Sequence, residues 1–223
     1  MIDEGVDASH PDLRNNIWKS SGEVPGNGID DDRNDYVDDV NGWDFANYDA
    51  SVYDPDHING TGEEHGTHVA GTIAAAVNNA TGVTGVNWQA RVMSLKFLGP
   101  NSGSTVDAVE AINYAVANGA DISNDSWGYV GAPNRSLRDA ITRADNAGHL
   151  FVAAAGNGGA DSVSDNNDAN SDNTNSPSSY GNPNIISVAA TDNRDTLASF
   201  SNFGASTVDE VVPRLERVQH ASH

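Results

Sequence analysis

The sequence of 223 residues contains no cysteine and only two lysines. Without cysteine the chain can form no disulfide, no thiolate metal site and no thiol nucleophile. Acidic side chains outnumber basic ones by 32 to 11, which gives a formal net charge of -21. A chain of this charge repels polyanions, so nucleic acids and acidic membranes are poor partners for it.

Long apolar runs are also missing. None reaches the roughly 18 residues needed to cross a bilayer, and the N-terminus lacks the charged, apolar and small-residue order of a secretory leader. Leu, Ile, Val and Phe together number only 43, a proportion typical of disordered chains. These residues are nevertheless gathered into the short blocks VMSLKFL, FVAAAG and IISVAA, which predict buried strands. We therefore expect one globular domain.

From residue 65 onward, helical and strand patterns alternate as they do in a parallel sheet with crossover helices. The second predicted helix begins at a cap on Ser104 or Thr105, and the third at a capping box of Ser136 and Asp139. Helices are predicted at 65–78, 104–118 and 136–147, and strands at 91–98, 121–127, 149–156 and 184–191. The polar segments 22–60 and 158–184 are expected to be surface loops.

Three short motifs place reactive side chains next to these elements. Asp3 ends an apolar stub, His65 begins a helix, and Asn157 ends a strand. A histidine can act as a general base, an aspartate can fix its tautomer, and an asparagine amide can donate to a developing oxyanion. Ligands gather at the carboxyl ends of the strands of a parallel sheet, so the three side chains are expected to converge.

The motifs MIDEGVDASHPDL, EEHGTHVAGTIAA and LFVAAAGN resemble those of the subtilisin-like serine proteases (subtilases, peptidase family S8). The resemblance covers residues 1–208 and implies that they form part of a subtilase catalytic domain, whereas 209–223 is a divergent tail. It implies a three-layer α/β fold with a mainly parallel sheet flanked by helices. Compared with the family pattern, the sequence is truncated at both ends.

The resemblance also implies roles for individual residues. Asp3 would orient His65, His65 would be the general base, and Asn157 would donate its amide to the oxyanion. The second histidine, His68, would be structural. The alternative that His65 and His68 bind a transition metal lacks an obvious third ligand. Glu4 stands where the family has Ser or Thr, which adds a carboxylate beside Asp3.

The segment SNDSWG resembles the strand that lines the family's substrate cleft. The resemblance implies that Ser126, Trp127 and Gly128 pair with the backbone of an extended peptide or protein substrate. No Gly-Thr-Ser-Met-Ala type motif follows Asn157, so the nucleophile is unknown. We expect a serine endopeptidase by family whose activity, in the chain as written, is weak or absent. The alternative is a non-catalytic subtilase-like module that binds peptides or calcium.

Two calcium sites are predicted. The resemblance implies that Asp12 and the loop VNNATGVTGV hold structural Ca²⁺, with ligands from Val77, Asn79, Thr81 and Val83. In the segment GNGIDDDRNDYVDD, oxygen donors at alternating positions predict a second site at Asp30, Asp32, Asn34 and Asp39. A solvated loop without an ion is the alternative for this second segment.

Three further expectations depend on the resemblance or on the short ends of the chain. An extracellular location follows from the resemblance alone. The bond between Ser176 and Pro177 falls where the family has a cis proline, so a cis bond is predicted. A dimer would cover sheet surface that the family buries.

Overall fold

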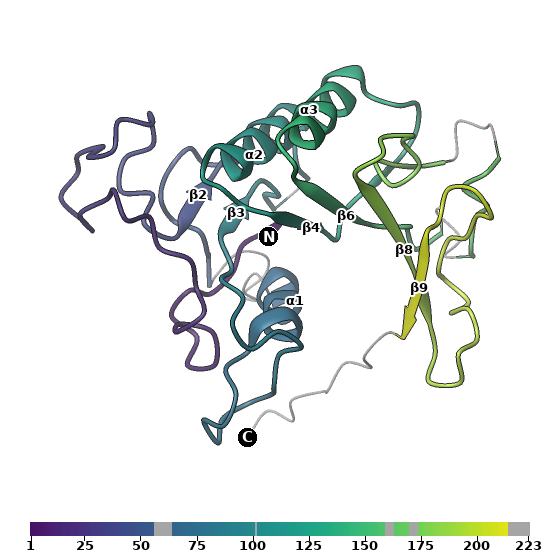
Figure 1. Cartoon of the computed structure of the whole chain (residues 1–223), viewed down its shortest axis with the longest axis horizontal. Helices are drawn as coiled ribbons and strands as arrows, with labels where there is room; N and C mark the ends of the chain where they lie inside the picture. Colours follow the sequence, from purple (N-terminus) through teal and green to yellow (C-terminus); the bar gives the residue numbers. More distant parts are fainter. Residues whose placement is uncertain (56–63, 101, 159–162, 170–173, 214–223) are drawn as a thin grey trace. The chain divides into compact units, whose positions relative to one another are not determined.

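The computed structural model describes residues 1–55, 64–100, 102–158, 163–169 and 174–213 (Figure 1). The chain divides into two compact units. The first unit consists of Met1–Ser126 and Asn134–Leu150, and the second of Trp127–Pro133 and Phe151–His223. Among the described residues no helix is long and apolar enough to span a membrane.

The first unit contains a parallel sheet of three short strands, β1 (Ile2–Asp3), β3 (Ser94–Lys96) and β2 (Gly42–Asp44), in the order β1-β3-β2. All the residues of these strands are buried. The parallel register pairs Asp3 with Lys96 and Lys96 with Asp44. A fourth strand, β4 (Ile122–Asp125), follows later in this unit. The strand predicted at 91–98 is therefore present but shorter.

Three helices belong to the first unit: α1 (Glu64–Ala74), α2 (Thr105–Ala117) and α3 (Arg135–Asn146). Ser104 caps α2, because its side chain accepts from two backbone N–H groups. Asn134 rather than Ser136 caps α3 through a hydrogen bond from the Leu137 N–H. Helices α2 and α3 lie side by side (Figure 1) and bury alanine, leucine and isoleucine side chains.

Helix α1 ends at Ala74, four residues before the predicted end. Its buried face contributes Ala70 and Ala74 to an apolar cluster with Val6, Leu13 and other side chains. Because the helix stops at Ala74, Val77 begins a loop instead of extending this face.

The second unit contains the parallel strands β6 (Leu150–Ala154), β8 (Ile185–Thr191) and β9 (Glu210–Pro213), in which β8 lies between the other two. Figure 1 shows β8 and β9 side by side, and their register pairs Val188 with Glu210. The short strands β5 (Tyr129–Val130) and β7 (Asn175–Ser176) pair antiparallel. The Ser176–Pro177 bond is cis, as predicted. Parallel strands and helices thus confirm the α/β class.

The expectation of a surface loop at 158–184 is wrong for several of its described residues. Asn167, Asn175 and Ser178 are each at least nine-tenths buried, as is Tyr180. These side chains are polar or small, which explains why the composition indicated exposure. Within 22–60, about half of the described residues are exposed, and the expectation of a surface loop is wrong for β2, Phe45, Glu23 and Asp39, which are buried. Residues 56–63 of this segment and 214–223 of the predicted tail lie outside the described residues.

Candidate active site

Asp3 and His65 form the central hydrogen bond of the site. Strand β1 ends at Asp3, whose side chain is 1 % exposed, and His65 lies in the first turn of α1 with its side chain 47 % exposed. The two side chains meet at 2.9 Å between His65 Nδ1 and Asp3 Oδ1. Asp3 Oδ1 also accepts from the backbone N–H of Glu4 at 2.8 Å. A buried carboxylate on Nδ1 fixes the tautomer and the orientation of the ring.

Gly66 allows helix α1 to approach β1 this closely. A Cβ atom at Gly66 would lie 2.2 Å from the carbonyl oxygen of Gly5 and 3.3 Å from Cβ of Asp3. No side chain larger than hydrogen fits there without a shift of backbone. Thr67, the next residue of the helix, accepts a hydrogen bond from the N–H of Asp7 at 2.9 Å. At Gly66 the helix therefore approaches the backbone of the segment after β1 directly.

Glu4 adds a second carboxylate at the start of α1. Its Oε1 accepts from the backbone N–H of His65 at 2.7 Å. The first N–H groups of a helix have no partner within the helix, and a negative charge there is favourable. Glu4 thus stabilises the helix turn that holds the His65 side chain.

Asn157 belongs to the second unit and follows β6. It is exposed, and it lies between Gly156 and Gly158, both of which have positive φ angles. The loop that contains it is held by hydrogen bonds to its backbone. The N–H of Gly158 donates to Asn202 Oδ1 at 2.7 Å, and the N–H of Asn202 donates to the carbonyl of Gly156 at 2.9 Å. The backbone of Asn157 is therefore fixed while its side chain remains accessible.

Two more buried asparagines, which the sequence analysis missed, support this loop. Asn167 Nδ2 donates to the carbonyl of Ala155 at 2.7 Å, and Asn175 Nδ2 donates to that of Ala154 at 3.1 Å. Asn202 Nδ2 also donates to Asn167 Oδ1 at 3.2 Å. We call Asn167, Asn175 and Asn202 the amide network. In the sequence these residues stand among many exposed asparagines and aspartates, and nothing in the local pattern separates them.

The predicted cleft residues follow β4 in an irregular stretch instead of lying within the strand. The ring of Trp127 packs edge-on against Phe151, with ring centroids 6.3 Å apart. A Cβ atom at Gly128 would lie 2.8 Å from the amide atoms of Asn175. Ser126 Oγ accepts from Asn124 Nδ2 at 2.9 Å. A residue larger than glycine at position 128 would therefore collide with Asn175 of the amide network.

Comparison with known proteins agrees with this geometry. A model of the subtilase family matches residues 1–215. The chain belongs to the subtilase family. The subtilase match ends at residue 215, and the predicted boundary between domain and tail at residue 208 stays a prediction.

Among curated relatives, a thermophilic serine proteinase of Bacillus sp. (strain AK1) is 38 % identical over 98 % of this chain and 44 % of its own length. Thermitase of Thermoactinomyces vulgaris is 37 % identical over 96 % of this chain and 61 % of its own length. The subtilase chain thus spans less than two thirds of the length of these relatives.

Solved structures show the same fold. The epidermin leader peptide processing serine protease of Staphylococcus aureus superposes with a TM-score of 0.68 at 26 % identity, covering 95 % of this chain and 50 % of its own. A cold-adapted subtilisin-like serine proteinase gives 0.65 at 26 % identity, covering 95 % and 60 %. The chain therefore has the subtilisin-like α/β fold that its motifs predicted.

The loop after α1 contacts Asp12 through two hydrogen bonds. Asp12 is 2 % exposed. Its Oδ1 accepts from Asn79 Nδ2 at 2.6 Å and its Oδ2 from the Val83 N–H at 2.9 Å. Asn79 Oδ1 accepts from the N–H of Thr81 at 3.1 Å. Both of these contacts to Asp12 come from nitrogen donors, so the calcium site at this loop stays a prediction.

The second predicted site differs in composition from the expectation. One ligand oxygen each from Glu23, Asp32 and Asp39 lies within 4.8 Å of the other two. Asp30 lies outside this group, and its oxygens accept backbone N–H groups of Arg33, Asn34 and Asp35. Glu23, which precedes the alternating segment, was missed.

The carboxylates of this loop are electrostatically strained. Burial raises the pKa of Asp39 above its ordinary value. The pKa of Asp32 is also raised, by desolvation first and by the charge of Asp39 second. Asn34 Nδ2 and the Tyr114 hydroxyl donate to Asp39 Oδ2. Both bonds favour the ionised form of Asp39, and they oppose the effect of burial.

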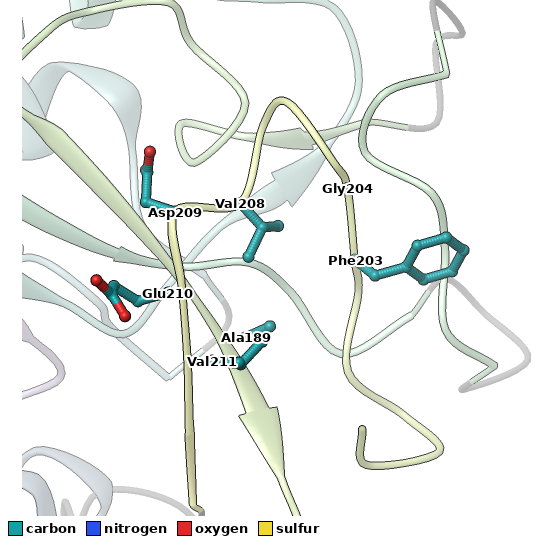
Figure 2. Close-up of a pocket in the computed structure, with 7 residues that line it drawn as sticks. All are labelled: Ala189, Phe203, Gly204, Val208, Asp209, Glu210 and Val211. Atoms are coloured by element: carbon teal, nitrogen blue, oxygen red, sulfur yellow. The ribbon is translucent and has the colours of Figure 1, made fainter. Parts of the chain in front are cut away.

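A small cavity of about 250 Å³ lies in the second unit. Figure 2 shows its lining, in which Ala189 of β8 faces the start of β9 and the ring of Phe203 points away from Ala189. Asp209, which also lines it, accepts the Ser187 N–H at 2.9 Å and so supports the sheet. None of the predicted site residues is among the seven lining residues, and the cavity has no role in the chemistry considered below.

Proposed function

We propose that the chain supplies the general-base pair, the oxyanion donor and the cleft segment of a serine endopeptidase. The observation that supports this most directly is the 2.9 Å hydrogen bond between the buried Asp3 and the half-exposed His65. A buried acceptor on Nδ1 with an accessible ring is the arrangement that a serine triad requires. Membership of the subtilase family is consistent with the same chemistry.

In the proposed reaction, His65 Nε2 takes the proton of a serine hydroxyl while the serine oxygen attacks the carbonyl carbon of the substrate. The resulting imidazolium is stabilised by the carboxylate of Asp3. The side-chain amide of Asn157 donates to the carbonyl oxygen as its negative charge develops. The protonated His65 then gives its proton to the leaving amine, which separates and leaves an acyl-enzyme for water to hydrolyse.

The substrate in this proposal is an extended peptide or protein segment. The absence of a side chain at Gly128, which is exposed, leaves backbone accessible for pairing with another chain. Recognition through backbone does not read the substrate's side chains, so we expect broad specificity. We also propose an extracellular location, on the strength of the family alone.

We expect the 223 residues by themselves to hydrolyse peptides weakly or not at all, since none of their serines stands in a Gly-Thr-Ser-Met-Ala type motif. Removing the serine of a subtilisin triad lowers kcat by about 10⁶, a value taken from a subtilisin and not from this geometry. On the strength of the family we also propose that Asp12 and Asn79, with backbone oxygens of Val77, Thr81 and Val83, hold a structural Ca²⁺ whether or not the chain is active. Calcium would supply charge neutralisation at the buried Asp12.

Labelling with a fluorophosphonate probe tests the proposed chemistry, because the probe reacts only with an activated serine. The purified chain would be labelled in calcium, beside His65→Ala and Asp3→Asn variants, and any adduct located by peptide mapping. A serine labelled in the parent and not in either variant would show a working base pair and overturn the expectation of weak activity. Labelling that survives in both variants would refute the role of Asp3 and His65.

A further inference from the structure

The dipeptide Asn157–Gly158 in the loop after β6 is chemically labile. In such a dipeptide the backbone nitrogen of the glycine can attack the side-chain carbonyl carbon of the asparagine, because glycine has no side chain to hinder the approach. The new C–N bond closes a succinimide ring, and the amide nitrogen leaves as ammonia with the proton of the attacking N–H. Water then opens the ring to aspartate or isoaspartate. Asn157 is exposed, so water reaches the site of this reaction.

The fold requires the glycine of this dipeptide. Gly158 has a φ of 75°, a backbone conformation that favours glycine. A Cβ atom at this position would also lie 2.3 Å from the carbonyl oxygen of Val163. A larger residue after Asn157 would slow the attack, but it does not fit here. Any protection of Asn157 therefore comes from the surroundings of the loop and not from the residue that follows it.

Asn202 holds the backbone on both sides of Asn157. Its backbone N–H donates to the Gly156 carbonyl at 2.9 Å, and its Oδ1 accepts from the Gly158 N–H at 2.7 Å. Oδ1 also accepts from the Asp165 N–H at 3.0 Å, and Asn202 is only 1 % exposed. The nitrogen that would attack Asn157 therefore has its proton bound to a buried acceptor that other hydrogen bonds hold in place.

This hydrogen bond opposes the reaction in two ways. The attacking nitrogen has to lose its proton, and the bond to Asn202 Oδ1 holds that proton. The bond also fixes the plane of the peptide group between Asn157 and Gly158, so the nitrogen does not turn toward the asparagine side chain unless the loop opens. Deamidation then proceeds from the open state of the loop, and its rate reports how often the loop opens.

We propose that Asn157 is a site of spontaneous deamidation and that Asn202 protects it. The modification replaces an amide, which donates hydrogen bonds, with a carboxylate, which only accepts them. Its effect on the oxyanion rests on the proposed function. The deamidation itself does not, because it changes the mass of the chain whether or not the chain cleaves peptides.

The chain contains internal controls for the same chemistry. Asn27–Gly28 and Asn118–Gly119 are the same dipeptide in the first unit. Their glycine N–H groups donate to an aspartate side chain and to a backbone carbonyl of α2, so Asn202 is the acceptor at neither site. Unfolding of the whole chain would accelerate deamidation at all of these sites. Loss of the bond to Asn202 is expected to accelerate it at Asn157 alone.

The test follows deamidation by mass and does not use activity. The full chain is incubated at neutral pH with calcium and digested, and deamidation at each site is measured by mass spectrometry of the peptides. Incubation in urea gives the rates of the unfolded chain, and hydrogen exchange measures the protection of the Gly158 N–H. The decisive variant is Asn202→Ala, which removes the acceptor. The matched control is Ser201→Ala, which removes a neighbouring buried side chain whose Oγ accepts from the Ala190 N–H.

In the parent chain we expect deamidation of Asn157 to be at least about tenfold slower than in urea. In Asn202→Ala the rate at Asn157 is expected to rise about fivefold or more, because the bond to the Gly158 N–H is lost. The rates at Asn27 and Asn118 are expected to stay within about twofold of the parent. Ser201→Ala should match the parent at the same sites within about twofold.

Three results would overturn the proposal. The first is a rate at Asn157 in Asn202→Ala that equals the rate in the parent or in Ser201→Ala. The second is an equal acceleration at Asn157, Asn27 and Asn118 in a variant that circular dichroism shows to be folded. The third is a Gly158 N–H that exchanges without protection in the parent, and this measurement decides alone if Asn202→Ala does not fold.

Discussion

The close contact at Gly66 predicts that alanine at this position destabilises the chain, and Gly71 of the same helix provides a matched control. In Gly66→Ala the new methyl group would lie 2.2 Å from the Gly5 carbonyl oxygen, which is backbone and has no rotamer to adopt. In Gly71→Ala, also within α1, the methyl group would meet nothing within 4 Å. Alanine favours a helix over glycine by about 0.5–1 kcal/mol, and this gain is common to both variants.

The difference between the two variants therefore isolates the cost of the contact. Overpacking of a tight site costs about 1–3 kcal/mol, and we expect the upper end because the opposing atoms are backbone. Gly71→Ala is expected to be as stable as the parent or slightly more stable. Unfolding in urea, followed by circular dichroism with calcium present, measures both variants against the parent. Equal midpoints for Gly66→Ala and Gly71→Ala would refute the claim that α1 and β1 are held at this distance.

Three other predictions concern buried charge and pH. The Asp44 carboxylate is fully buried and lies 2.9 Å from Lys96 Nζ. Lys96→Met leaves this carboxylate without its cation and is expected to lower the free energy of unfolding, measured in urea, by about 3–5 kcal/mol. Adding Asp44→Asn should recover part of that loss. Burial lowers the pKa of His149. The contribution of His149 to stability is therefore present above the unfolded pKa of about 6.5 and is lost as the pH falls below it. In His149→Gln, the midpoint of urea unfolding should depend less on pH across this range. Hydrogen bonds from Thr207 and Ser206 lower the pKa of Asp168 to about 2. The stability that the Asp168 carboxylate gives is therefore present above about pH 4 and is lost as the pH falls through 2. An NMR titration should find that Thr207→Val raises the pKa of Asp168, and an unchanged pKa would contradict the role of the Thr207 hydrogen bond.

The helices were predicted well because their signals are local. Ser104 caps α2 through its own side chain, and the periodic apolar residues that follow it form one buried face. The cap of α3 was misplaced by two residues, since Asn134 and Ser136 are both good capping residues and only the backbone geometry decides between them. The strands β2, β5, β7 and β9 were not predicted, and β9 lies in the segment expected to be a divergent tail. Strands of two to four residues depend on pairing partners far away in the sequence.

The site was predicted in part for the same reason. Asp3 and His65 stand in long motifs, and the structure places them in contact. Alternating oxygen donors suggested Asp30, but the group of neighbouring carboxylates contains Glu23 and not Asp30. Which carboxylate faces which depends on how the loop folds. Spacing along the chain does not contain that information.

The amide network makes the chain sensitive to a very small chemical change. Over most of this acidic surface, asparagine and aspartate are close to interchangeable. At Asn167, Asn175 and Asn202 they are not, because each amide donates to an oxygen atom that a carboxylate would repel. Spontaneous deamidation of Asn175 would set a negative charge against the Ala154 carbonyl and loosen the loop that presents Asn157. The conformation of the loop around Asn157 therefore depends on three side-chain amides that lie outside the proposed catalytic groups.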